Sequence, residues 1–349
     1  IKNKKYIMPI IAWVAVLILS LWVLIKSADY FTDYAEQLGK ILRLPNFIIG
    51  VVIVAIGTSL PEFATSIMGV YQGDVEFLSG NVLGTVIVNI LLGLGIAVIF
   101  TKRKTIFNWD IVSNDLPFFA AAIFLVVVSL MDGHFSKVEA LLFLAGYIIY
   151  IIYAYYIQKE IKDTAQKEYK KELSKEIKSG LEEMEEKDKK ASSKFFDKIL
   201  KKEIKIVVIL LFSLGIVAIA SHFVVTSVLN LAVILGLGTS VLAATVVALG
   251  TSLPEILVAL SAARRGNFDM VIGDILGSNI FDIFVIYGVA GLITPLTITH
   301  ELFVILSIFL VGCFFLLWLV LIDKKITKSE ALMFIVIYVL FAGKLFNIF

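Results

Sequence analysis

The feature that most constrains this fold is a hexapeptide, Gly-Thr-Ser-Leu-Pro-Glu, that occurs twice inside apolar runs. The copies occupy residues 57–62 and 250–255, 193 residues apart. A proline inside a helix removes a backbone donor and frees a carbonyl of the preceding turn. In lipid, such groups must be satisfied by protein, water or an ion. A carboxylate at bilayer depth costs about 3 kcal/mol on insertion scales. Both copies therefore predict a buried polar site, and a bound cation is its simplest explanation.

The composition places the two hexapeptides in a membrane protein. Apolar residues make up 59% of the chain, and its mean hydropathy is +0.95, far above a soluble domain. A Lys- and Glu-rich stretch, 158–203, separates two groups of five apolar runs. Each run is long enough, or nearly so, to cross about 30 Å of hydrocarbon. The ten runs lie near 7–30, 46–70, 80–100, 115–131, 137–157, 204–229, 240–263, 271–293, 302–322 and 329–346.

We therefore predict an all-α membrane protein with ten transmembrane helices in two five-helix repeats, residues 1–157 and 204–349. The stretch 158–203 is either an amphipathic helix outside the bilayer or a linker, and it contains no EF-hand pattern. The charges are segregated, so the net charge of +2 gives no reason to expect nucleic-acid binding. No nucleophile–base pair or histidine metal set lies at membrane depth, so we do not expect an enzyme or a cofactor.

Lys and Arg residues are distributed unequally between the predicted loops. The loops 71–79, 132–136, 230–239 and 294–301 contain neither residue. The loops on the same side as 158–203 contain Lys40, Arg43, Lys102, Arg103, Lys104, Arg264, Arg265, Lys324, Lys325 and Lys328. The positive-inside rule then places 158–203 in the cytoplasm. The lysines at positions 2, 4 and 5 run against this orientation.

The similarity between the two copies extends beyond the hexapeptide. The same shift of 193 residues aligns Gly73 with Gly266, Gly80 with Gly273, Gly84 with Gly277, Thr85 with Ser278 and Asn89 with Asp282. Five predicted spans separate corresponding helices, and because five is odd, the copies cross the membrane in opposite directions. Inverted repeats are typical of secondary transporters, which bind their substrates near the bilayer midplane. The repeat predicts a transporter.

Polar side chains in each copy recur at four-residue steps, which places them on one helix face. The pairs are Thr58 with Glu62, Thr85 with Asn89, Thr251 with Glu255, and Ser278 with Asp282. With the carbonyls freed near the prolines, they form a set of hard oxygen ligands without imidazole or thiolate. Such a set suits calcium, magnesium, sodium or manganese. A flexible cage of many protein oxygens favours calcium over magnesium.

Other polar and small residues have an ordinary structural explanation. The small-xxx-small glycines, Gly80 with Gly84 and Gly273 with Gly277, are typical of close helix packing. The acids at positions 29 and 33 lie at the predicted cytoplasmic end of the first span, where an interfacial acid is unremarkable. Glu62 and Glu255 have no such explanation, because no Lys or Arg lies within the central part of any predicted span.

These motifs resemble the α-repeats of the calcium/cation antiporter superfamily, and the sodium/calcium exchanger branch of prokaryotic type is the most similar. The resemblance rests on the paired GTSLPE segments, followed by GNVLGTVIVN and GDILGSNIFD, within about 45–100 and 240–293. It implies a 5+5 inverted fold in a prokaryotic plasma membrane that exchanges calcium for sodium by alternating access. The implied ligands of calcium and sodium are Glu62, Glu255, Thr58, Thr251, Asp282, Asn89, Ser59, Ser252, Thr85, Ser278, Ala55 and Ala248. Of these, Thr58, Thr251, Ala55 and Ala248 would bind through their backbone carbonyls.

Three residues depart from the pattern of that family and leave the coupling ion open. Thr85 stands where Ser is frequent, and Asp282 where some branches carry Asn. Asp274 stands where Asn is frequent and adds a carboxylate on the face of Ser278 and Asp282. A proton/calcium or potassium-dependent exchanger of the same fold is therefore the alternative function. A cation channel that uses the same acids is the alternative from another class. The oligomeric state cannot be read from the sequence.

Overall fold

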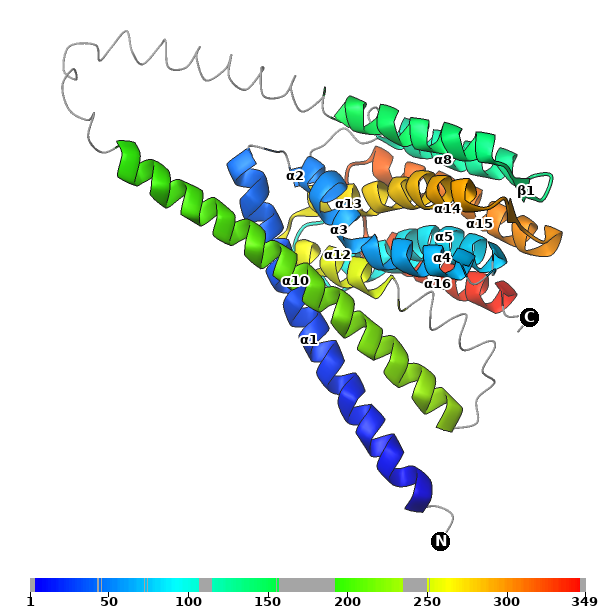
Figure 1. Ribbon diagram of the computed structural model, residues 1–349, viewed down its shortest axis with the longest axis horizontal. Helices are drawn as coiled ribbons and strands as arrows, with labels where there is room; N and C mark the ends of the chain where they lie inside the picture. Colours follow the sequence, from blue (N-terminus) through cyan, green and yellow to red (C-terminus); the bar gives the residue numbers. More distant parts are fainter. Residues whose placement is uncertain are drawn as a thin grey trace.

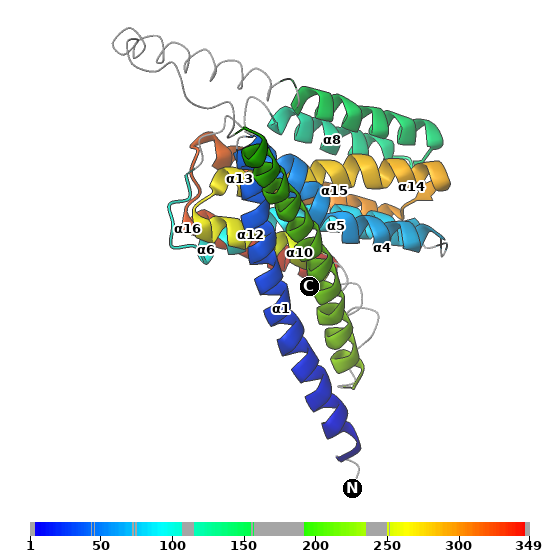
Figure 2. The same cartoon turned by 60° about the vertical axis from the view of Figure 1, so that its left-hand side comes forward.

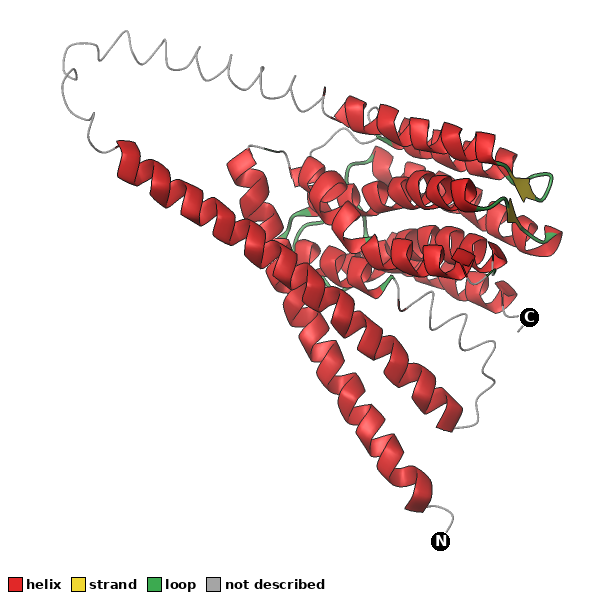
Figure 3. Cartoon of the chain, in the orientation of Figure 1, coloured by secondary structure: helices red, strands yellow, loops and turns green. Residues whose placement is uncertain are grey.

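The computed structural model describes residues 4–42, 44, 46–71, 73, 75–106, 115–154, 156, 192–234, 250 and 252–345. Nearly all of these residues are helical (Figure 3). The helices are α1 (Lys4–Leu42), α2 (Asn46–Ile48), η1 (Ile49–Val54), α3 (Ala55–Thr58), α4 (Leu60–Tyr71), α5 (Val75–Val88), η2 (Asn89–Gly93), α6 (Leu94–Ile99), α8 (Leu116–Ser129), the helix Lys137–Ala154, α10 (Ser192–Ile234), α12 (Leu253–Arg265), α13 (Phe268–Phe281), η3 (Asp282–Ile286), α14 (Tyr287–Ile293), α15 (His300–Ile322) and α16 (Lys328–Leu345). Two short strands, β1 (His134–Phe135) and β2 (Leu296–Thr297), pair antiparallel.

Two long helices differ from the others in how they are placed. α1 and α10 pack against each other and run obliquely past a bundle formed by the remaining helices, and both extend beyond it (Figure 1, Figure 2). Large apolar side chains such as Trp22 of α1 and Phe212 of α10 are exposed. A continuous apolar surface of this kind suits contact with lipid.

Seven of the described helices are long and apolar enough to cross a membrane. They are Ile10–Leu42, Asn46–Tyr71, Leu78–Ile99, Lys137–Ala154, Ile204–Val224, Phe268–Ile293 and His300–Ile322. The predicted span 115–131 is the shorter apolar helix α8, and the span 329–346 corresponds to α16. The first part of the predicted span 240–263 lies outside the described residues, which resume at Gly250. The chain is thus a mostly helical membrane protein, as the hydropathy predicts.

Two helix boundaries differ from the prediction. α1 continues to Leu42, well past the predicted end at residue 30, and α10 begins at Ser192, inside the predicted loop 158–203. Hydropathy detects only the part of a helix that lies in lipid, so polar extensions at its ends are missed. The remainder of the predicted loop, up to residue 191, lies outside the described residues.

Local geometry repeats with the same 193-residue shift as the sequence. Gly73 and Gly266 adopt left-handed φ values of 85° and 82°, and each ends a helix before the next one begins. A glycine reaches this conformation without the penalty that a Cβ imposes. The wide π-helical turns η2 and η3 begin at Asn89 and Asp282, which also correspond. Such turns often mark functional positions in helices.

Two loop-to-loop contacts join the halves of the chain, and the same shift relates them. The Ile298 N–H donates to the Gly133 carbonyl at 3.1 Å, beside the β1–β2 pair, and the Ile326 N–H donates to the Thr105 carbonyl at 3.1 Å. Adding 193 to 105 and 133 gives 298 and 326. Since Thr105 precedes α8 and Gly133 follows it, the contacts lie at opposite ends of the bundle.

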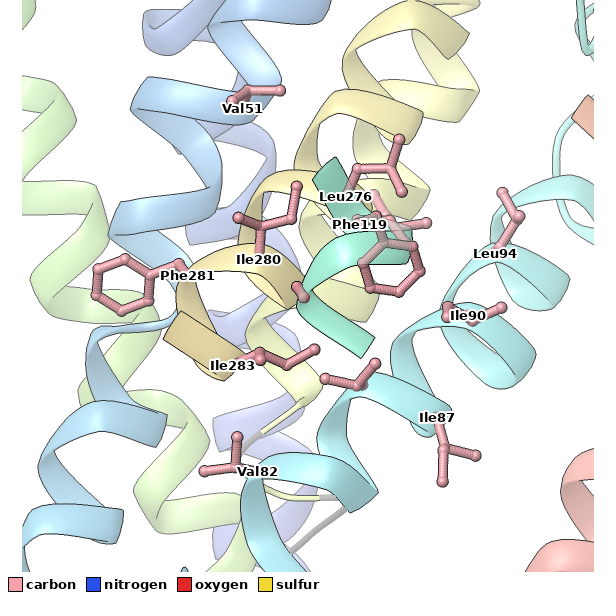
Figure 4. Close-up of a cluster of buried hydrophobic side chains, with 14 of the residues drawn as sticks. Val51, Val82, Ile87, Ile90, Leu94, Phe119, Leu276, Ile280, Phe281 and Ile283 are labelled. Carbon is pink, nitrogen blue, oxygen red and sulfur yellow. The ribbon is translucent and has the colours of Figure 1, made fainter. Parts of the chain in front are cut away.

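The core of the bundle is apolar and closely packed. Side chains from η1, α13, α5 and α8 converge there, among them Val51, Leu276, Val82 and Phe119 (Figure 4). Glycines bring α13 against η1 at backbone distance. A Cβ added at Gly277 would lie 2.7 Å from the Val51 Cα, which confirms the packing role predicted for that glycine. The polar site is built on these tightly held helices.

Candidate ion-binding site

In both hexapeptides the serine has the same backbone geometry and a new helix begins directly after it. Ser59 lies between α3 and α4 with φ −79° and ψ 0°, and Ser252 precedes α12 with φ −80° and ψ −3°. Each following Leu-Pro-Glu opens a new helix, where the proline's missing N–H costs nothing because first-turn donors are unpaired in any case. Glu62 and Glu255 therefore occupy first turns of helices. The positive end of the helix dipole favours a negative charge there.

One freed carbonyl has a protein partner. Pro254 removes the donor that would bind the Gly250 carbonyl, and the Ser221 hydroxyl of α10 donates to that oxygen at 2.7 Å. The Ala55 carbonyl, predicted as an ion ligand, accepts the Ser59 N–H at 3.0 Å and the Thr58 hydroxyl at 3.3 Å. The predicted carbonyl ligands at positions 248 and 251 lie outside the described residues.

Three predicted acidic ligands come together and are almost fully buried. Glu62 is 1% exposed, Glu255 3% and Asp282 0%. Glu62 and Asp282 lie within electrostatic range of Glu255, and Asp274 does too. The donors that face these carboxylates are neutral: the backbone N–H of Glu255 for its own side chain, and the Ser59 hydroxyl for Asp282. Because a buried charge without compensation costs several kcal/mol per ion, bound cations would stabilise the ionised form of this cluster.

Neither ion pair that the described residues form involves Glu255 or Asp282. The ion pairs within the described ranges are Lys40 with Glu36 on the surface of α1, and Arg265 with Asp33. No group of three or more His, Cys, Asp or Glu side chains among the described residues is arranged to hold one metal ion. A divalent ion would therefore use the glutamate pair together with hydroxyl, amide and carbonyl oxygens, which is the mixed oxygen shell that calcium accepts.

The predicted hydroxyl and amide ligands lie where the two halves of the chain meet. Ser252 and Thr85, from opposite halves, place their hydroxyl oxygens 3.4 Å apart. The Asn89 amide donates to the Asn279 side-chain oxygen at 3.3 Å. Ser59 is fully buried, and its hydroxyl faces the Asp282 carboxylate. These contacts put polar ligands from both repeats around the carboxylates.

One buried polar residue here, Asn279, was missed by sequence reasoning, whereas Ser278 was among the predicted ligands. Asn279 is fully buried and holds the Asn89 amide, but its counterpart in the first copy is Val86, so the repeat gives no signal for it. Ser278 bonds to the Ile275 carbonyl of its own helix at 3.2 Å. Its hydroxyl oxygen still has a lone pair to offer an ion.

A second polar cluster fastens α1 to α12 and corrects the prediction for positions 29 and 33. The Ser261 hydroxyl donates to Asp29 Oδ1 at 2.8 Å, and Arg265 Nη2 donates to the Asp29 carbonyl at 2.9 Å. Arg265 also forms an ion pair with Asp33. These residues line a cavity of about 390 Å³ that also includes Lys26. The two acids are therefore interhelical contacts rather than isolated interfacial charges.

Comparison with known proteins agrees with this geometry. The sodium/calcium exchanger protein family matches residues 12–156 and 205–346. The chain belongs to this family. It is 31% identical to the sodium/calcium exchanger MaX1 of Methanosarcina acetivorans, with 95% of this chain and 98% of that protein covered. It is 30% identical to the membrane protein MJ0091 of Methanocaldococcus jannaschii, at 95% and 97% coverage.

Solved structures lead to the same family. A structure of the sodium-calcium exchanger NCX_Mj, soaked with sodium and without calcium, superposes with a TM-score of 0.73 at 29% identity, covering 95% of this chain and 98% of that one. A second NCX_Mj structure, soaked with sodium and strontium, gives 0.73 at 28% identity. The function predicted from the repeats, sodium/calcium antiport, is confirmed at the level of the family.

Proposed function

We propose that this exchanger-family member exports Ca²⁺ in exchange for Na⁺ by alternating access through a ten-helix fold of two inverted repeats. The observation that carries the proposal is the buried group of acids drawn from both halves of the chain: Glu62, Glu255 and Asp282 are at most 3% exposed, and Glu255 lies within electrostatic range of the other two. In its ionised form, such a cluster is stable only when cations supply the missing charge. Binding and release of those cations then become part of the working cycle.

Exchange follows from charge balance at the glutamate pair. A calcium ion held between Glu62 and Glu255 cancels both charges, and monovalent cations on the glutamates and on Asp282 do the same. The emptied site leaves like charges close together in a poor dielectric, which raises its energy. We infer that either load permits the closed, dehydrated intermediate and that the empty site does not. Exchange without leak is the result.

Repeated geometry supports the inverted topology. The two serine breaks, the two π-helical turns and the two loop contacts are each related by the 193-residue shift, and the loop contacts lie at opposite ends of the bundle. An axis in the membrane plane produces this relation. We propose residues 1–157 and 204–349 as the two repeats and 158–203 as their connection.

The moving part is the pair formed by α1 and α10. The two helices pack against each other and run obliquely across the bundle (Figure 1). The bundle itself is tied at both ends by the loop contacts and through its middle by glycine-mediated packing. A sliding motion of the pair over the rigid remainder opens the site to each side in turn. The distribution of Lys and Arg places residues 158–203 in the cytoplasm of a prokaryotic plasma membrane.

Transport assays with Glu62→Gln test this function. We expect the wild type in proteoliposomes to take up radiolabelled calcium when sodium leaves the vesicle, and we expect Glu62→Gln to lose that uptake while remaining folded. The glutamine keeps the size of the side chain and removes the charge that calcium needs. The matched control is Glu301→Gln, an exposed acid of α15, which should transport normally.

The same assay separates the alternatives. Uptake driven by an outward proton gradient alone would indicate a proton/calcium exchanger of the same fold. Uptake that occurs only in the presence of potassium would indicate a potassium-dependent exchanger. Uptake that proceeds equally without any gradient would indicate a channel. Wild-type transport by Glu62→Gln would remove that residue from the site.

A further inference from the structure

A fourth buried acid, Asp274, lies beside the site and has no role in the function proposed above. It belongs to α13, two turns before Asp282, and is 2% exposed. It lies within electrostatic range of Glu255. The 193-residue shift aligns it with Asn81, so the second repeat carries a negative charge where the first carries a neutral amide.

Asp274 has little to compensate its charge. Its Oδ1 atom is 3.5 Å from the Thr58 hydroxyl, which also contacts the Val54 carbonyl at 3.1 Å. Its Oδ2 atom has no hydrogen-bond partner within the described part of the chain. Asp274 also takes part in neither of the two ion pairs that the described residues form. One long hydrogen bond does not offset the desolvation of a carboxylate.

The contact made by its counterpart shows that Asp274 does not simply repeat a structural hydrogen bond. In the first copy the Asn81 amide donates to the Ser66 hydroxyl at 3.0 Å. The residue that corresponds to Ser66 is Ala259, which offers no hydroxyl. The second copy therefore lacks the structural partner and has a carboxylate in place of the amide.

The helices beside Asp274 pack too closely to admit a basic side chain. α13 lies against α2 and η1 at backbone distance: a Cβ added at Gly273 would be 2.3 Å from the Phe47 carbonyl oxygen, and one at Gly50 would be 2.7 Å from the Asp274 nitrogen. One carboxylate and one hydroxyl carry a single negative charge. Hard oxygens of this kind suit an alkali cation, whereas a divalent ion requires more ligands and more charge.

We propose that Asp274 and Thr58 bind an additional small monovalent cation next to the glutamate pair. This inference rests on the proposed exchange function and adds a ligand to it. Calcium cancels the two glutamates alone, so the charge of Asp274 requires a cation of its own. The number of monovalent cations that cooperate at the site then exceeds the number that Glu62, Glu255 and Asp282 hold.

The test compares Asp274→Asn with Asp115→Asn. Asp115 is also a buried carboxylate, 2% exposed, but it lies beside Tyr150 and outside the electrostatic neighbourhood of Glu255. In proteoliposomes we expect Asp274→Asn to lower the Hill coefficient for sodium by about one, because that coefficient is bounded by the number of sites. The calcium concentration for half-maximal uptake should change little. Asp115→Asn should keep the wild-type sodium dependence.

A binding measurement accompanies the transport assay. Sodium and potassium should each be titrated against the thermal stability of the purified full chain, since a ligand that binds the folded state raises it. We expect Asp274→Asn to lose part of the monovalent-cation stabilisation and to keep the calcium stabilisation. Asp274→Glu, which retains the charge, should keep more of it than Asp274→Asn.

Each outcome decides one question. If the wild type shows no sodium-driven uptake, the proposed function fails. If the wild type exchanges and Asp274→Asn keeps its sodium and potassium dependence, only this inference fails. A change confined to the pH dependence would assign a proton to Asp274 and overturn the cation site. If Asp274→Asn and Asp274→Glu are equally unstable, the residue is structural and the inference is wrong.

Discussion

Glu62 and Glu255 show at the residue scale why ions are needed. Each lies in the first turn of a helix. The helix dipole contributes at most about 2 kcal/mol to a partly buried charge there, whereas a buried carboxylate costs several kcal/mol. The dipole therefore orients and partly stabilises the glutamates but leaves most of their desolvation cost to the bound cation.

Gly277 makes a testable prediction at the same scale. A Cβ at this position would lie 2.7 Å from the Val51 Cα and 2.8 Å from its carbonyl oxygen, and backbone atoms cannot rotate away. We expect Gly277→Ala to destabilise the protein by about 1–3 kcal/mol or more and to impair exchange, because α13 carries Ser278 and leads directly into Asp282, the first residue of η3. Thermal unfolding in detergent, with and without calcium, measures the loss.

Gly312→Ala is the matched control for that substitution. Gly312 lies in the middle of α15, and no described atom is within 4 Å of an added Cβ. Alanine is the better helix former by about 1 kcal/mol, so this variant should be as stable as the wild type or slightly more stable. Equal losses in the two variants would contradict the close approach of α13 to η1.

At the element scale, the polar contacts of the α1–α10 pair are unevenly distributed. Ser221 of α10 bonds to the Gly250 carbonyl, and Asp29 of α1 bonds to Ser261 and Arg265 of α12. All of these partners belong to the second repeat. The residue that corresponds to Ser221 in α1 is Ala28, which cannot make the equivalent bond. The proposed movement of the pair would therefore break contacts with α12 and with the Gly250 carbonyl that precedes it.

Arg265→Gln tests this attachment. The change removes the ion pair with Asp33 and weakens the bond to the Asp29 carbonyl. A lost hydrogen bond costs about 1 kcal/mol, which corresponds to roughly fivefold more frequent local opening. We expect faster hydrogen–deuterium exchange in residues 26–33. The adjacent, exposed Arg264 supplies the control Arg264→Gln, and identical exchange in both variants would contradict the attachment.

The arrangement of the two loop contacts makes a prediction at the scale of the whole molecule. His134 in β1 and Lys325 next to Ile326 are both exposed, and they lie at opposite ends of the bundle. In a Cys313→Ala background, we expect a membrane-impermeant maleimide to label His134→Cys in intact cells. Lys325→Cys should be labelled only after the membrane is opened. Labelling of both from the outside would contradict the proposed topology.

Local chemistry made much of the site predictable from sequence. The prolines fixed where the helices break, and the four-residue steps placed the carboxylates and hydroxyls on shared faces. Contacts between distant segments were not predictable in this way. The pairing of Asp29 with Ser261 joins residues 232 apart, and Asn279 gained its role only from the position of Asn89. The polar ends of α1 and α10 were missed because hydropathy reports the lipid-embedded part alone.

The shift that converts the Thr105–Ile326 contact into the Gly133–Ile298 contact has a further consequence. Where residues i and j are in contact, residues i+193 and j−193 are in contact as well. An isologous interface between two copies of one five-helix unit produces this kind of pairing. In the proposed topology, the folded chain therefore has the internal symmetry of a homodimer whose subunits point in opposite directions. Covalent fusion removes the requirement that both copies be identical. The two halves can therefore differ at corresponding positions, as Asn89 differs from Asp282 and Asn81 from Asp274. Two identical chains in a homodimer could not differ in this way.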